Sequence, residues 1–167
     1  MANLATLIGG AYGCTYDAVA IGITQDGFDL IQSLAEEVIN ESDFYGGSMI
    51  DYFYRGGSCQ LRADSMEYKA GSILPYWPYG GGAMGIMRNA SNPIGKRASD
   101  VADSIVLTST AGTPAAAAPA TLTATYAALA PGQQSTLKFT SKLRRVPLFW
   151  QLLPYDSSSN TIWYALT

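Results

Sequence analysis

The sequence predicts a mainly β protein, an antiparallel sandwich or half-barrel with one short flanking helix and long loops. Apolar and polar residues alternate along several segments, as in strands with one buried face, and glycine- or proline-rich segments separate them. Hydrophobic residues make up 48% of the chain and charged residues 14%, a balance that favours a packed fold over disorder. The 167 residues suit one domain, placed at 1–167, with long loops at about 35–47, 80–100 and 111–120.

A first hairpin is predicted near the N-terminus. Residues 19–23 and 28–34 each place apolar side chains at every second position, except that Gln32 interrupts the second segment. Asp26 and Gly27 lie between these two segments, and glycine readily adopts the positive φ that a tight hairpin turn requires. We therefore predict two short strands joined by a turn at Asp26-Gly27.

A second hairpin is predicted from residues 49–54 and 59–63, with its turn at Gly56-Gly57. The segment between the two hairpins, residues 35–47, is longer than the roughly two to five residues of an ordinary hairpin loop. It is acidic and contains Phe44 and Tyr45 near its end. We predict that it is a loop, which at this length either binds something or is flexible.

A short helix is predicted from Asp64 to about residue 70 or 74, because Asp64 followed by Glu67 is typical of a helix N-terminus. Residues 75–82 contain two prolines and three glycines, which disfavour regular structure. Further strands are predicted at 105–109, 121–126, 137–144, 146–153 and 162–166, which gives about eight strands in the whole chain. The strand at 137–144 has one basic face, the strand at 146–153 is expected to be the most buried, and a turn at 156–160 precedes the last strand.

Composition excludes several kinds of chemistry. The chain has no histidine and only two cysteines, which excludes a Ser-His-Asp triad, a Cys-His pair and a four-cysteine zinc site. Paired carboxylates at Glu36-Glu37, or at Asp26 with Asp29, are weak candidates for glycan cleavage, since neighbours in a strand point to opposite faces. We expect no catalytic residue, no metal site, no cofactor and no enzymatic activity.

Other motifs favour a structural role. The glycine-rich segment 80–85 lacks the Gly-Lys-Ser/Thr ending of a phosphate-binding loop. Tyr76, Trp77 and Tyr79 are aromatic residues of the type that stack on sugars, although we expect them in a core or a subunit interface. The N-terminus lacks the pattern of a signal peptide, and no apolar run reaches the ~20 residues of a membrane helix. We expect synthesis in the cytoplasm and no membrane partner.

The net charge of -3 conceals an asymmetry. Residues 1–67 carry ten acidic and two basic residues, whereas residues 68–167 carry three acidic and eight basic residues. Two interpretations stay open. The charges either pair within one subunit, or give each subunit two oppositely charged ends that favour head-to-tail stacking of copies.

The order of several motifs resembles the major tail tube proteins of tailed bacteriophages, over most of the chain. The motifs are Tyr12-Gly13-Cys14-Thr15-Tyr16, the run from Ile21 to Phe28, Asp43-Phe44-Tyr45-Gly46, the run from Ile50 to Gly57, Met66-Glu67-Tyr68, and the run from Leu143 to Leu148. The resemblance implies a β-sandwich or half-barrel with one flanking helix. It also implies a virion structural protein whose hexameric rings stack into the hollow tail tube, the conduit for genome ejection.

This resemblance implies specific partners and a location. The partners are copies of the chain itself together with tape measure, tail terminator and baseplate proteins, and DNA passes through the lumen without specific binding. The location is the tail of the virion, with assembly in the host cytoplasm. Alternatives are another tail ring component, such as a terminator or connector, or a monomeric carbohydrate-binding or glycan-cleaving β-sandwich.

For the contact between rings we hypothesise that the acidic segment 35–47 of one subunit meets the basic strand 137–144 of the next. Aromatic residues would anchor the contact, and the charges would orient it. The residues in this hypothesis are Glu36, Glu37, Glu41, Asp43, Phe44, Tyr45, Lys138, Lys142 and Arg144.

Overall fold

The computed structural model describes residues 12–41, 48–66, 94–109, 121–130, 132, 145–157 and 160–167. These residues form ten strands and one short 3-10 helix. The strands are β1 (Tyr12–Tyr16), β2 (Val19–Ala20), β3 (Thr24–Glu41), β4 (Ser48–Ser65), β5 (Asp103–Ser109), β6 (Thr121–Leu129), β7 (Val146–Leu152), β8 (Tyr155–Ser157), β9 (Asn160–Ile162) and β10 (Ala165–Leu166). Within the described residues, no helix has the length and apolar character needed to cross a membrane.

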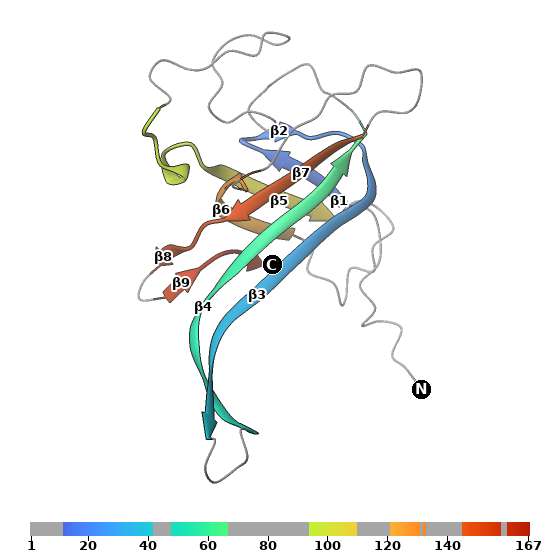
Figure 1. The fold of residues 1–167 in the computed structure, drawn as a ribbon. Coiled ribbons are helices and arrows are strands. Elements are labelled where there is room, and N and C mark those ends of the chain that lie inside the picture. The colour runs from blue at the N-terminus through green and yellow to red at the C-terminus, as the bar shows by residue number, and fades with distance from the viewer. Residues whose placement is uncertain are drawn as a thin grey trace, which may run out of the picture.

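Eight of the strands form one antiparallel sheet, which confirms the prediction of a mainly β fold (Figure 1). The strand order is β2-β1-β5-β6-β7-β4-β3, with β10 paired to β6, while β8 and β9 form a separate two-stranded sheet. The sheet curls, so that side chains of strands that are not adjacent in it meet: the ring of Tyr16 on β1 stacks on that of Trp150 on β7, with the ring centroids 6.2 Å apart. The architecture is therefore a half-barrel made from a single sheet.

The connection between β2 and β3 links the two sides of the half-barrel. The backbone N–H of Ile21 donates to the carbonyl of Cys14 on β1 at 3.0 Å. The backbone N–H of Met66, just after β4, donates to the carbonyl of Ile23 at 2.8 Å. Residues 21–23 thus hold one side of the sheet beside the other.

The core lies in the hollow of the curled sheet. Trp150, Leu61 and Ile105 come from three different strands, and each is 0% exposed. The hydroxyl of Tyr16 donates to the carbonyl of Ala127 on β6 at 3.1 Å, which satisfies a buried polar group. Buried and half-buried residues alternate along β7, so this strand is buried as predicted on one face and only half-buried on the other.

The two predicted hairpins are in fact one long hairpin. Asp26 and Gly27 have φ angles of 60° and 81°, yet β3 pairs with β4 on both sides of them, at Gln25↔Asp64 and at Phe28↔Ala63. The two residues form a bulge inside β3. The predicted turn is wrong because adjacent residues with positive φ also fit a bulge when the partner strand continues past them.

The second predicted turn, at Gly56-Gly57, is also wrong. Ala35 pairs with Gly56 and Glu36 pairs with Tyr54, which leaves Arg55 as an extra residue in β4. Gly56 has a φ of 131°, a conformation that residues with side chains rarely adopt, and it accommodates this irregularity. β4 therefore runs without interruption through both glycines.

The loop predicted at 35–47 is wrong for residues 35–41, which belong to β3, and residues 42–47 lie outside the described residues. Charged side chains at Glu36 and Glu37 are compatible with a strand here, because both faces of the hairpin are exposed at this point.

The predicted helix falls largely outside the described residues. Its proposed first residues, Asp64 and Ser65, end β4, because both pair with β3 and β7. The helix described by the structure is the 3-10 turn Ala98–Asp100, where the N–H of Arg97 donates to the Asp100 carboxylate at 2.8 Å. The predicted loop 111–120 and the strand 137–144 also lie outside the described residues, as does the loop 80–100 up to residue 93.

Candidate functional site

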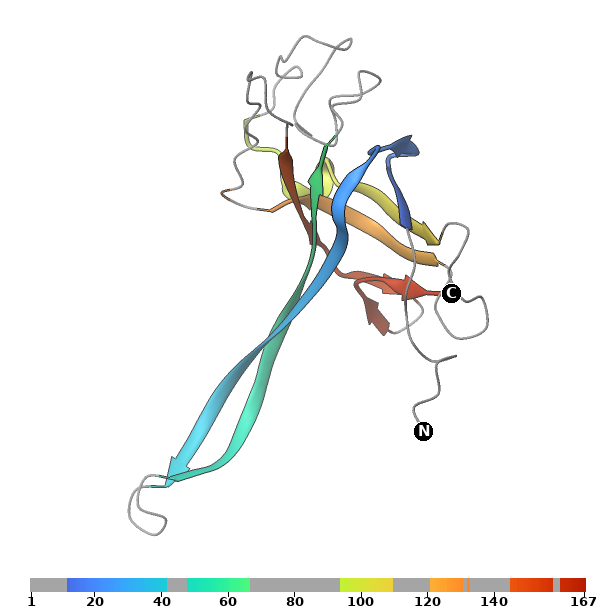
Figure 2. The same ribbon diagram turned by 90° about the vertical axis from the view of Figure 1, so that its right-hand side faces the viewer.

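The outer half of the β3–β4 hairpin forms a two-stranded arm, defined here as residues 33–41 of β3 and 48–58 of β4. Strand β7 pairs with β4 only from Cys59 to Ser65. Among the described residues no third strand continues alongside the arm. Figure 2 shows the arm projecting away from the rest of the sheet.

One face of the arm continues the core face of the sheet and carries an apolar stripe. Directly paired residues of an antiparallel ladder lie on the same face of the sheet. Leu30 and Leu61 form one such pair in the core, and Leu34 lies on the same face further along β3. The pairs Glu36↔Tyr54 and Val38↔Tyr52 continue this face along the arm. The stripe consists of Leu34, Val38, Met49, Tyr52 and Tyr54, which are 69%, 48%, 62%, 50% and 58% exposed. Each of these side chains leaves about half or more of its surface open to contact.

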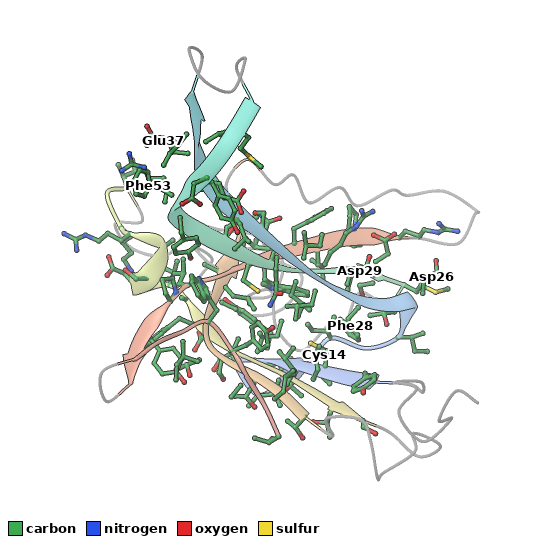
Figure 3. All side chains as sticks on the ribbon, turned by 90° about the horizontal axis from the view of Figure 1, so that it is seen from below. Cys14, Asp26, Phe28, Asp29, Glu37 and Phe53 are labelled. Atoms are coloured by element: carbon green, nitrogen blue, oxygen red, sulfur yellow. The ribbon has the colours of Figure 1, made fainter. Side chains whose placement is uncertain are left out.

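The opposite face of the arm is more polar. The guanidinium of Arg55 donates to the Glu37 carboxylate in an exposed ion pair. The hydroxyls of Ser33 and Ser58 lie 2.7 Å apart in a hydrogen bond. Phe53 pairs across the ladder with Glu37 and is an exposed large apolar residue on this face (Figure 3).

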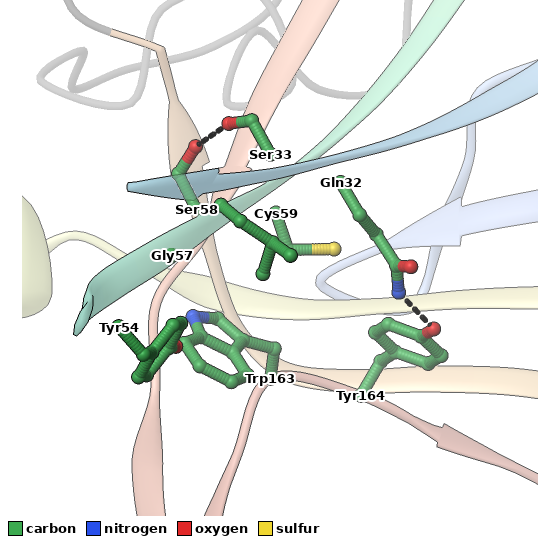
Figure 4. Close-up of a pocket in the computed structure, with 9 residues that line it drawn as sticks. Gln32, Ser33, Tyr54, Gly57, Ser58, Cys59, Trp163 and Tyr164 are labelled. Carbon is green, nitrogen blue, oxygen red and sulfur yellow. Dashed lines mark hydrogen bonds between the residues drawn. The ribbon is translucent and has the colours of Figure 1, made fainter. Parts of the chain in front are cut away.

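A cavity of about 190 Å³ lies where the apolar stripe meets the rest of the sheet (Figure 4). Tyr54, Trp163 and Tyr164 contribute aromatic rings to its wall, and Gln32 Nε2 donates to the Tyr164 hydroxyl. Gly57 also lines it, and a Cβ added there would lie 3.1 Å from the carbonyl oxygen of Ser33 and 3.2 Å from the Tyr54 hydroxyl. A side chain at position 57 would therefore crowd the wall.

Burial raises the pKa of several titratable groups among the described residues. Burial raises the pKa of the Cys14 thiol to about 12 and also raises the pKa of Cys59, so both free thiols are poor nucleophiles. Burial and the nearby charge of Asp17 raise the pKa of Asp103. In the part of the chain that the structure describes, no three His, Cys, Asp or Glu residues cluster as metal ligands would.

Three of the nine predicted contact residues lie in the described part of the chain, all on β3. Glu36 and Glu37 are exposed, but they point to opposite faces of the strand, and Glu37 is paired with Arg55. For Glu41 only the backbone is described. The other six residues lie outside the described part of the chain: Asp43, Phe44, Tyr45, Lys138, Lys142 and Arg144.

Sequence reasoning missed the apolar stripe. The alternation of Tyr52 and Tyr54 was visible, but it indicated a hairpin strand with a covered face. The overlooked signal was on the other strand, where Leu34 and Val38, with Glu36 between them, occupy every second position of the segment predicted to be a loop.

The structure does not place Asp26 and Asp29 together in a turn as the glycan-cleavage hypothesis would need. Asp26 lies in the bulge of β3, and Asp29 lies further along β3 opposite Arg62 of β4. The aromatic residues Tyr76, Trp77 and Tyr79 lie outside the described residues.

No model of a known protein family matches the sequence, and the search of curated proteins finds no match either.

Proposed function

We propose that the chain is a virion structural protein that assembles into stacked rings, hexameric by the family resemblance, to form the tail tube of a bacteriophage. The observation that carries this proposal is the arm, whose apolar stripe is exposed while the strands that continue from it line the core. A large exposed apolar surface on a folded chain marks an interaction site. A subunit whose neighbours cover such a surface suits a continuous assembly.

The energetics of the arm favour a partner. A two-stranded hairpin is at best marginally stable in water by itself. Full burial of a Val, Leu or Met side chain contributes about 1.5–3 kcal/mol, so covering the five residues of the stripe offsets a substantial part of the cost of association. The backbone of β3 is also an edge of the sheet among the described strands, and an edge strand can pair with another chain.

In this proposal the main partners are copies of the same chain. The stripe supplies the binding energy, and charges such as Glu36 orient the contact. Tape measure, terminator and baseplate proteins meet the tube, and DNA passes through its lumen without specific binding. The subunit needs no cofactor and catalyses no reaction, and its place is the virion tail after assembly in the host cytoplasm.

The first test removes the arm. Ala35 and Gly56 are directly paired, so replacing residues 36–55 by Asn-Gly closes the hairpin with a favourable two-residue turn. We expect the full chain to form rings or tubes of uniform width by negative-stain microscopy and sedimentation. The shortened chain should keep its β circular dichroism and its cooperative unfolding while remaining monomeric. Normal tubes from the shortened chain would contradict the proposal.

A matched pair of substitutions then separates the two faces of the arm. Tyr52→Lys places a charge in the apolar stripe, and Phe53→Lys places the same charge on the opposite face. The two side chains are 50% and 59% exposed, so neither change should unfold the subunit. We expect Tyr52→Lys to reduce assembly more strongly than Phe53→Lys. Equal effects would mean that the stripe is not the principal contact.

A second candidate function is carbohydrate binding, which the aromatic cavity at the base of the arm favours. Aromatic rings stack on sugars, and Gln32 supplies an amide beside them. Glycan-array screening of the full chain, followed by titration of Trp163→Ala, tests this function. Glycan binding that Trp163→Ala abolishes, in a chain that stays monomeric at high concentration, would establish this candidate in place of the tube subunit.

A further inference from the structure

A second apolar cavity, of about 270 Å³, opens in the hollow of the half-barrel. The described residues of its wall are all apolar or aromatic, and they come from β1, β3, β4, β5, β6 and the C-terminal strand β10. They are Phe28, Leu30, Leu61, Leu107, Leu122 and Leu166, with Tyr12 at its edge. Leu61 and Leu107 are buried, whereas Phe28 and Leu30 are half-buried and Leu166 is 50% exposed. The cavity therefore offers apolar surface to an occupant.

The chain itself supplies a candidate occupant beside this cavity. Tyr12 is the first described residue and belongs to the cavity wall, so residues 1–11 are attached at the cavity. These eleven residues carry no charged side chain and include Leu4, Leu7 and Ile8. Ile8 is four residues from Tyr12, and four residues of extended chain span at most about 14 Å. The connecting segment is therefore long enough for Ile8 to reach the cavity of its own subunit.

Residues 110–120 are the competing segment, because they connect β5 to β6 at the same end of the sheet. Tyr12 pairs with Ser109, and Thr108 pairs with Thr121. The apolar side chains of this segment are those of alanine and proline. The gain from burial grows with the apolar area removed from water, so leucine and isoleucine side chains gain more from an apolar cavity than alanine does.

We propose that residues 1–11 fold back onto their own subunit and place Leu7 and Ile8 in this cavity. A segment tethered at the edge of its binding site has an effective concentration in the millimolar range, which favours it over the same segment of a neighbouring copy. The occupied cavity completes the core of the half-barrel. This inference is independent of the proposed tail-tube function, because it concerns the folded subunit alone.

Photo-cross-linking of the full-length chain tests the placement. A benzophenone amino acid replaces Leu7 in one variant and Ala115 in a matched control variant. We expect irradiation of the Leu7 variant to give cross-links to the cavity wall, at or next to Leu30, Leu61 or Leu122. Cavity cross-links from Ala115 in place of Leu7, or cross-links from Leu7 only to residues elsewhere, would overturn the proposal.

The same experiment distinguishes the subunit's own segment from that of a neighbour. Irradiation is carried out on an equal mixture of ordinary and ¹⁵N-labelled chains, and the cross-linked peptides are analysed by mass spectrometry. Peptide pairs in which both partners carry the same label support docking within one chain. Pairs of mixed label in the statistical proportion would show that a second copy fills the cavity, contrary to the proposal.

A solution measurement gives a second readout that needs no cross-linker. Replacing Leu4, Leu7 and Ile8 together by serine should leave the cavity open, and the fluorescence of an added apolar dye should rise several-fold. The matched control replaces Ala2, Ala5 and Ala11 by serine, which changes the same number of residues in the same segment and should leave dye fluorescence near that of the unmodified chain. Equal dye fluorescence from the two variants would overturn the proposal.

Discussion

The two halves of the β3–β4 hairpin share an alternation of apolar residues on one face but have opposite surroundings. In the inner half, Leu61 and Ala63 are buried, because β7 pairs with β4 along Cys59–Ser65 and the curled sheet covers the face. In the outer half, Leu34 and Tyr52 continue the same face of the same strands and are largely exposed. Alternation of apolar residues therefore specifies the strand and its faces, whereas the neighbouring strands decide whether a face is buried.

The largest difference between the two halves should come from one matched pair of substitutions. Leu61→Ala removes a fully buried side chain, and we expect it to lower the free energy of unfolding by about 2–5 kcal/mol. Leu34→Ala removes the same atoms from the exposed arm and should change that free energy by less than about 0.5 kcal/mol. Urea denaturation of the monomeric chain measures both. Similar losses would mean that the arm is part of the cooperative core.

Two of the three irregularities in the β3–β4 ladder sharpen the comparison, since each of these two contains a glycine with positive φ. Gly27 lies where β3 pairs with the core part of β4. Gly27→Ala imposes a left-handed conformation on a residue with a Cβ and should cost about 1–2 kcal/mol of unfolding free energy. Gly56→Ala strains the arm instead. We expect it to leave global unfolding nearly unchanged and to speed amide hydrogen exchange of residues 33–41.

A result in which Gly56→Ala lowers global stability as much as Gly27→Ala would show that the arm and the core unfold together. Asp26→Gly provides a control for the first bulge. Asp26 already has a φ of 60°, so glycine relieves strain there and should not destabilise the chain.

The change of the free energy of unfolding with pH should come from residues of the core and not from the arm. Burial raises the pKa of Cys14 from 9.0 to about 12, so between these values the unfolded chain loses a proton that the folded chain keeps. The contribution of this thiol to the free energy of unfolding is therefore complete below pH 9 and is lost as the pH rises toward 12. We expect a contribution of about 1.4 kcal/mol to be lost by pH 10. Chemical denaturation of the intact chain and of Cys14→Ala at pH 8 and pH 10 measures the difference.

Cys14→Ala should weaken this pH dependence even though it destabilises the chain at pH 8. An unchanged slope between pH 8 and pH 10 would assign the effect to other groups, such as Tyr16, whose pKa burial also raises. Removal of the arm should leave the slope as it is, because Cys14 packs in the core.

The smallest effect is expected from the ion pair of the arm. Arg55 and Glu37 have side chains that are 61% and 56% exposed, and solvent screens such a pair. A double-mutant cycle with Arg55→Met and Glu37→Gln should give a coupling of about 0–1 kcal/mol that decreases as salt is added. A larger coupling that persists at high salt would indicate that the arm is better ordered and less solvated than its exposure implies.

Much of the sheet could be predicted from the sequence. Strands β5, β6 and β7 lie where the alternation places them, although β6 extends further, to Leu129. The turn predicted at 156–160 is partly strand, because β8 runs to Ser157 and β9 begins at Asn160. The predicted strand at 162–166 is divided, because β9 ends at Ile162 and β10 contains only Ala165–Leu166. The acidic character of the segment containing Glu36 and Glu37 was also visible, but its backbone conformation was not.

The sequence by itself determined that this protein is mainly β, which strand supplies the centre of its core, and that histidine and multi-cysteine chemistry are excluded. Only the tertiary structure decided that Asp26-Gly27 and Gly56-Gly57 are bulges and not turns, and that one long hairpin replaces two short ones. The physical reason is that a positive φ satisfies both a turn and a bulge locally. The choice between them depends on whether a partner strand continues alongside, and that partner is distant in the sequence.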